Sequence, residues 1–234
     1  MPSNAIAASG LRKLRGWPLL LGALSVCLHA AVSAEKTVPD SLPQGYHLRN
    51  EDVSPDKRFG VIHADVPTVD PDKARNYLVA LKPFRILSEN NGPAFYDEGG
   101  SRAMVVNWSE DSSVALVCVG GKWGTIGATL FKLKEGRVAR RSDLLAEVTR
   151  SLKAKFPKGK VRPYNASVPF VISNEDTWEL SADGRQVTID VAVDTAPNLA
   201  PGPAWRGTLK GRWSVSGARW LERQVAGKIH RNPE

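Results

Sequence analysis

The sequence predicts a β-dominated α+β domain, in which antiparallel hairpins form a meander sheet with one amphipathic helix. Three observations lead to this fold class. Short apolar runs separated by turn residues fill most of the chain, one of these runs places a large aliphatic residue at every second position, and a single stretch near residues 142–156 has helical periodicity. Together they favour strands that pair with their sequence neighbours over strands joined by helical crossovers.

The apolar runs are short and rich in β-branched residues, as strands are. Gly, Pro, Asn and Asp stand between them and favour tight turns. In residues 186–194, Val187, Ile189, Val191 and Val193 alternate with polar residues, so one face of this strand is expected to be buried. The runs that predict strands are residues 59–62, 77–81, 103–108, 114–119, 129–133 and 186–194.

One helix is predicted over residues 142–156, because apolar residues recur there every three or four positions. Ser142 is expected to cap its N-terminus, and Pro157 ends it. Its apolar stripe is expected to cover one face of the sheet. A basic tail follows, which is either a solvated helix end or a patch for an anionic polymer; it holds Lys153, Lys155, Lys158, Lys160 and Arg162.

The N-terminus has the layout of a signal peptide. Three basic residues in positions 12–15 precede an apolar stretch over 17–32, and cleavage is expected after Ala34. A retained membrane anchor and a lipoprotein site at Cys27 are the alternatives. The predicted organisation is a signal peptide at 1–34, a flexible leader at 35–45 and a single β-rich domain at 46–234. The mature protein is therefore expected to be periplasmic or secreted, and to contact the membrane only through the signal segment before cleavage.

The net charge limits which partners are expected, and the cysteine content limits which thiol chemistry is expected. Removing the signal peptide takes three of the 32 basic residues and no acidic one, so 29 basic residues face 24 acidic ones and the formal charge is +5. This mild excess favours an anionic envelope polymer or a protein partner, and no nucleic acid is expected. Cys118 is the single cysteine left, and its apolar surroundings indicate a small buried side chain and not a reactive thiol.

A turn pattern, Ser-x-Asp followed by polar residues and an apolar strand, occurs at residues 54–62, 109–117 and 181–189. The Ser and Asp side chains can accept backbone N–H bonds and fix a chain reversal. The pattern resembles the Trp-Ser-Pro-Asp-Gly turn in the blades of TolB-like and WD40-like β-propellers, most nearly at residues 108–112. This resemblance implies a small or incomplete propeller as an alternative fold, although the copies lie 55 and 72 residues apart, where blades repeat about every 40 to 50.

The chain also resembles exported bacterial proteins that share a Ser-Pro-Asp opening and a Lys-Trp-Gly segment, here Lys122-Trp123-Gly124. That resemblance implies export but no activity.

No catalytic, metal or cofactor site is predicted. Residues 120–127 are glycine-rich but run into a strand, which indicates a hairpin and not a phosphate-binding loop. His63 with Asp65, Asp70 and Asp72 is the densest group of potential ligands, and it lacks the order of a calcium loop. Asp190 and Asp194 share a strand face about 13 Å apart, too far for a glycosidase pair, and a partner such as Glu175, Asp176 or Glu179 cannot be placed.

The function is therefore open between two hypotheses. The first is an exported, non-catalytic domain that binds an envelope component or a protein partner through a basic, Trp-bearing surface. The residues expected there are Trp205, Arg206, Lys210, Arg212, Trp213 and Trp220, since they surround a Pro/Gly loop. The second is a hydrolase acting on cell-wall or polysaccharide material, with carboxylates brought together from separate strands.

Overall fold

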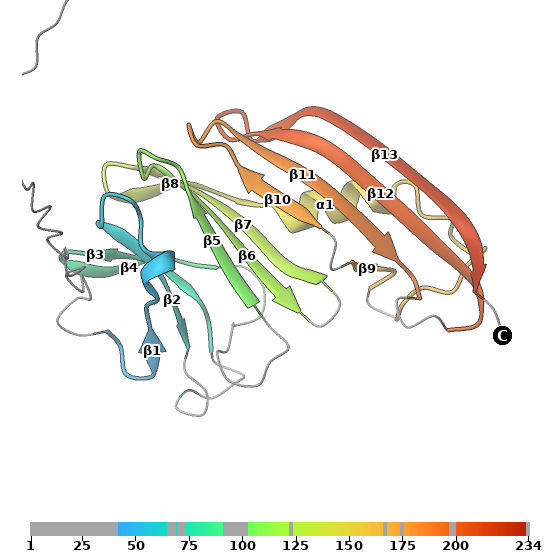
Figure 1. Cartoon of the computed structure of the whole chain (residues 1–234), viewed down its shortest axis with the longest axis horizontal. Coiled ribbons are helices and arrows are strands. Elements are labelled where there is room, and N and C mark those ends of the chain that lie inside the picture. The colour runs from blue at the N-terminus through green and yellow to red at the C-terminus, as the bar shows by residue number, and fades with distance from the viewer. Residues whose placement is uncertain are drawn as a thin grey trace, which may run out of the picture. The chain divides into compact units, whose positions relative to one another are not determined.

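The computed structural model describes residues 42–64, 69, 74–90, 103–121, 124–165, 168–173, 176–196 and 200–232. These residues form three antiparallel sheets and one α-helix (Figure 1). The predicted fold class, β-dominated α+β with a single amphipathic helix, is confirmed. The predicted signal segment, the cleavage site after Ala34 and most of the leader lie outside the described residues.

Each sheet is a meander in which consecutive strands pair. The first sheet consists of β1 (Tyr46–His47), β2 (Phe59–Ala64), β3 (Tyr77–Leu81) and β4 (Phe84–Glu89), with a short 3₁₀ helix, η1 (Asn50–Asp52), between β1 and β2. The second consists of β5 (Ala103–Trp108), β6 (Val114–Gly121), β7 (Gly124–Lys134) and β8 (Arg137–Asp143). The third consists of β10 (Thr177–Leu180), β11 (Gln186–Asp194), β12 (Gly202–Ser214) and β13 (Arg219–Asn232), with β9 (Val171–Ile172) paired to β11.

The three Ser-x-Asp turns have the same geometry. In each one the serine hydroxyl donates to the aspartate at 2.7 Å and accepts the N–H of the residue that opens the next strand. The fourth residue of each turn has a positive φ, which is 59° at Lys57, 60° at Ser112 and 66° at Gly184. The predicted hairpin device is therefore confirmed at all three places.

The turns also contact one another. The Asp56 N–H donates to the Ser112 hydroxyl over 3.1 Å, and the Glu110 N–H donates to the Ala182 carbonyl over 2.9 Å. Three equivalent hairpins thus meet in series, one from each sheet. The order of strands within each sheet resembles that of propeller blades, and within the described residues the sheets do not close into a ring.

The central strands of the second sheet, β6 and β7, are buried on both faces. One face packs on the first sheet through residues such as Val117 and Phe131, which meet Val61 and Leu78. The other face packs through Leu116 and Leu130 on the third sheet and on the helix. This explains why residues 114–119 form a continuous apolar run, because a strand covered on both sides needs no polar face.

The helix α1 (Leu144–Lys153) follows the second sheet and precedes the third in sequence, and it packs on both sheets. Its buried stripe contains Leu144, Val148 and Leu152. The predicted cap at Ser142 is wrong: Ser142 belongs to β8, and Asp143 caps the helix by accepting the Ala146 N–H at 2.9 Å. In the described part of the chain, no helix has the length and apolar character that crossing a membrane requires.

Candidate functional site

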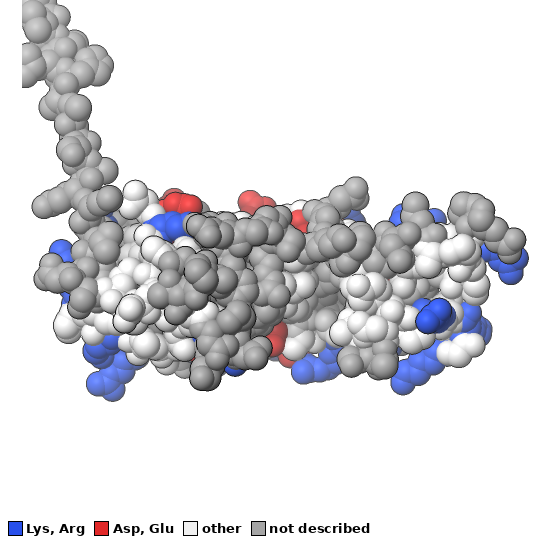
Figure 2. Space-filling model, turned by 90° about the horizontal axis from the view of Figure 1, so that it is seen from below, with Lys and Arg blue, Asp and Glu red and all other residues white. Residues whose placement is uncertain are grey.

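The basic tail predicted from the sequence is an exposed segment at the end of α1. We call residues 153–162 the basic segment; its five cationic side chains, Lys153, Lys155, Lys158, Lys160 and Arg162, are all exposed. Among the described residues, no carboxylate forms an ion pair with any of them. Figure 2 shows Lys and Arg gathered at the end of the described molecule where β12 begins and β13 ends in Figure 1.

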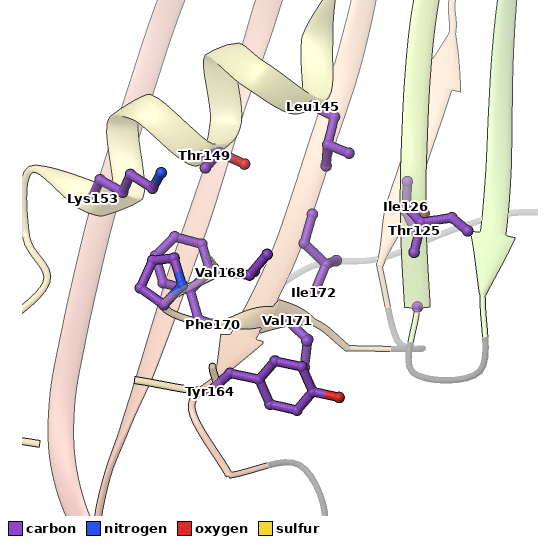
Figure 3. Close-up of a pocket in the computed structure, with 12 residues that line it drawn as sticks. Thr125, Ile126, Leu145, Thr149, Lys153, Tyr164, Val168, Phe170, Val171 and Ile172 are labelled. Carbon is purple, nitrogen blue, oxygen red and sulfur yellow. The ribbon is translucent and has the colours of Figure 1, made fainter. Parts of the chain in front are cut away.

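A pocket lies beside the basic segment, between α1, the start of β7, β9 and the chain leading to β9 (Figure 3). Its volume is about 450 Å³, within the range of about 300 to 1,000 Å³ that small-molecule sites occupy. The lining is mainly apolar. Its main members are Ile126, Leu145, Val168, Phe170, Val171 and Ile172.

The helix supplies one wall because of its periodicity. Leu145, Thr149 and Lys153 are four residues apart and therefore form a stripe on one side of α1. This stripe is separate from the buried one, and in Figure 3 it faces the chain that leads to β9. The helix therefore has two structural roles: it covers a sheet, as predicted, and it lines the pocket.

Gly124 allows β7 to approach β9. It has a φ of +144°, and a Cβ at this position would lie 2.3 Å from the Ile172 carbonyl oxygen and 2.5 Å from that of Ser173. Any other residue would push the backbone of β9 outward. Phe170, which lines the pocket, packs on the core residue Trp205 with ring centroids 5.7 Å apart, and Phe156 contacts the same indole at 5.5 Å.

Four polar side chains line the pocket: Lys153 and Thr149 from the helix, Tyr164 from the chain after it, and Thr125 from β7. Lys153 lines the pocket yet is exposed, which fits an apolar stem along the wall and an ammonium group at the opening. The pocket thus combines a mainly apolar lining with one positive group and three hydroxyls. This combination can bind an apolar chain and orient a negative group.

The predicted Trp residues lie mostly in the core. Trp205 and Trp213 are only 2% and 4% exposed, so neither ring offers a face to a ligand at the surface. Trp220 is half-buried and stands opposite Trp213 on the neighbouring strand, in an edge-to-face contact at 5.3 Å between ring centroids. The rings are used for cross-strand packing.

The three predicted basic residues of β12 do lie together on the outer, polar face of the third sheet. Each is already paired, however: Arg206 Nη2 with Asp194 at 3.2 Å, Lys210 Nζ with Asp190 at 2.6 Å and Arg212 Nε with Glu222 at 2.6 Å. The hydrogen bond and charge of Arg212 hold the pKa of Glu222 below its usual value. This face is therefore a ladder of opposite charges, and its positive field is largely cancelled.

The carboxylates considered for hydrolysis lie on the same face. Glu179 is opposite Thr188 and Asp190 is opposite Thr177, so the two are diagonal neighbours across β10 and β11. Glu179 is exposed, and Asp190 is engaged by Lys210. A glycosidase acid needs a buried setting to stay protonated, and neither carboxylate has one.

The remaining predictions concern metals and thiols. His63 is buried on β2, near His47 on β1, whereas Asp65, Asp70, Asp72 and Glu175 lie outside the described residues. The described residues contain no group of three or more side chains placed to hold a metal ion. Cys118 is buried as predicted, and desolvation, followed by the charge of Asp176, raises its pKa to about 12.

The glycine-rich stretch is a hairpin, as predicted, in which Gly121 of β6 pairs with Gly124 of β7; Lys122 and Trp123 lie outside the described residues. A comparison with protein-family models and with curated proteins found no match to this chain. The site is therefore defined by its own geometry.

Sequence reasoning identified the basic segment but missed the pocket. The pocket is built from residues about 20 to 45 positions apart in the chain, which only the tertiary fold brings together. One signal was available: Thr149 and Lys153 continue the spacing of Leu145 outside the main apolar stripe, so the helix had a second semi-apolar side.

Proposed function

We propose that this protein is an exported, non-catalytic domain that binds an anionic component of the cell envelope through its basic segment. The observation that carries the proposal is the absence of any ion pair, among the described residues, for the five cationic side chains of this segment. Positive groups without a fixed counter-charge keep their field available to a ligand. By contrast, each of the three basic side chains on β12 is paired with a carboxylate.

A binding role is favoured over hydrolysis by the surroundings of the ionisable groups. Asp190 and Asp194 of the third sheet are each ion-paired to a basic residue of β12. The buried thiol of Cys118 has a raised pKa, which keeps it protonated and unreactive. Export is expected from the predicted signal peptide. After cleavage following Ala34, the mature protein and its basic segment would have access to components of the envelope.

A comparison of two triple variants tests which basic surface binds. Lys155→Gln/Lys158→Gln/Lys160→Gln removes three unpaired charges, and Arg206→Gln/Lys210→Gln/Arg212→Gln removes three paired ones. Both variants change the net charge equally. The mature protein is mixed with phosphatidylglycerol vesicles, phosphatidylcholine vesicles or soluble anionic polysaccharide, and sedimented or eluted across a salt series.

We expect the first variant to lose most of its binding to phosphatidylglycerol vesicles and the second to bind like the wild type. Binding should weaken as salt rises, because exposed charges are screened. Equal losses in the two variants, or wild-type binding that does not depend on salt, would overturn the proposal. Preferential binding of the polysaccharide would keep the basic segment as the site but assign a polymer to it.

A further inference from the structure

The pocket beside the basic segment identifies the chemistry of the ligand. We infer that it holds the hydrocarbon chain of a single-chain anionic amphiphile, whose charged group is bound at Lys153. This inference rests on the proposed function and names the class of envelope component. The lining, the charge and the position of the pocket each support it.

The lining selects a hydrocarbon. Leu145, Ile126 and Val171 are only half-buried, so apolar side chains around the pocket remain in contact with water in the described structure. Covering them with an aliphatic chain removes that apolar surface from water, which is favourable at about 25 cal/mol per Å². A sugar or a polyanion strand would leave the same surface without an apolar partner.

The charge selects an anion at one end of the chain. Lys153 is the only cationic residue among the described residues that line the pocket, and they include no acidic residue. Its ammonium group forms no ion pair with a described carboxylate. A carboxylate, phosphate or sulfate group beside it would gain a charge-assisted hydrogen bond, and Thr149 on the same side of α1 adds a hydroxyl to this wall.

The position of the pocket joins the two parts of the site. Lys153 belongs both to the pocket and to the basic segment, so the headgroup of a bound chain would lie where the basic segment begins. The basic segment then serves to collect anionic amphiphile, and the pocket to hold one molecule of it. A second copy of this chain is a poorer occupant, since its own basic segment would repel Lys153.

The test is a titration of the full mature protein with dansyl-undecanoic acid, whose fluorescence rises in an apolar site. We expect saturable binding with one probe per protein. Lauric acid should displace the probe, methyl laurate should displace it about tenfold less well because it lacks the charge, and inorganic phosphate should not displace it. Absence of saturable probe binding would overturn the inference, as would equal displacement by the acid and the ester.

Two variants separate the parts of the pocket. Thr149→Phe fills it and should weaken both acid and ester by more than tenfold, whereas Ala146→Phe adds the same ring to the same helix outside the pocket and should change neither. Lys153→Gln should weaken the acid about tenfold and leave the ester unchanged, with Lys134→Gln as the matched control. Circular dichroism verifies that each variant is folded. Unchanged affinity of Thr149→Phe for both ligands would place the probe elsewhere.

Failure of the inference and failure of the proposed function give different results. If phosphatidylglycerol vesicles bind in a salt-dependent way but the monomeric probe does not, the pocket assignment is wrong and the basic segment remains the site. If the probe binds but anionic vesicles do not, the envelope-binding function is wrong and the pocket stands.

Discussion

The indole ring of Trp205 lies against Gly227 on the neighbouring strand. A Cβ at Gly227 would be 2.5 Å from Cζ2 of this ring, and a Cβ at Gly207, two residues after Trp205 on β12, would be 2.3 Å from its Cη2. Because Gly207 and Gly227 are opposite each other in the β12–β13 pair, the ring covers two adjacent glycines. The tryptophan thus supplies the packing that those two positions lack.

Gly227→Val is therefore expected to destabilise the domain, since its side chain would collide with a fully packed ring. We expect the free energy of unfolding to fall by about 1 to 3 kcal/mol. Ala226→Val, at the preceding residue and on the opposite, exposed face, should change it by no more than about 0.5 kcal/mol. Urea denaturation of both variants measures the difference, and equal stabilities would show that Trp205 does not occupy this space.

The Ser-x-Asp turns are expected to make stability depend on pH. The Ser109 hydroxyl first, and then the Ser113 N–H, hold the pKa of Asp111 below its ordinary value of 3.8. A depressed pKa stabilises the folded state above the unfolded pKa, and this contribution is lost as the pH falls through the folded pKa. We expect Asp111→Asn to be less stable than the wild type at pH 7, with a difference that shrinks below about pH 4.

Urea denaturation at several pH values between 7 and 2.5 measures this effect. Glu110→Gln, which removes a neighbouring exposed charge, is the control. A difference between Asp111→Asn and the wild type that stays constant with pH would contradict the assigned hydrogen bonds.

Gly124→Ala is expected to damage the pocket. The added Cβ would meet two backbone oxygens, and a φ of +144° is unfavourable for alanine, so β7 and β9 must separate. We expect a loss of about 2 kcal/mol or more, and loss of dansyl-undecanoic acid binding at temperatures where the variant is folded. Gly120→Ala on the same hairpin, where a Cβ would have only ordinary contacts from 3.7 Å, should keep both stability and binding.

Cys118 is expected to resist thiol reagents in the native protein, because burial raises its pKa to about 12 and very little thiolate exists at pH 8. Titration with a chromogenic disulfide should show no reaction over minutes in buffer and one thiol per molecule in urea. Rapid labelling of the folded protein at pH 8 would show that β6 opens easily.

The features that could be predicted from the sequence are local ones. The Ser109 turn needs only residues 109 to 114, and its hydrogen bonds follow from the side chains present. The strand at 186–194 was predicted with its observed bounds. The spacing of Val187, Ile189 and Val191 at every second position also indicates which face of this strand is buried. The helix was predicted two residues too long at its N-terminus and three too long at its C-terminus. The error at the N-terminus arose because capping by Ser142 or Asp143 depends on where β8 stops.

The features that were missed depend on register. Gly207, Gly211 and Gly227 weaken the strand signal, and so the long β12–β13 hairpin was not predicted. Trp205 was assigned to a binding surface, yet its alternation with Arg206 places the ring inside the core, against Phe156 and Phe170. Nothing in the local sequence shows which of two neighbouring side chains faces the core when both flank a Pro/Gly loop.

Between the second and third meanders, α1 and the chain leading from it to β9 supply the walls of the pocket that the sheets themselves do not provide. The contacts between the three sheets at their Ser-x-Asp turns are therefore separate in sequence from most of the pocket lining, which belongs to α1 and the chain leading to β9. Exchanging that connection offers a route to new ligand preferences on an unchanged frame.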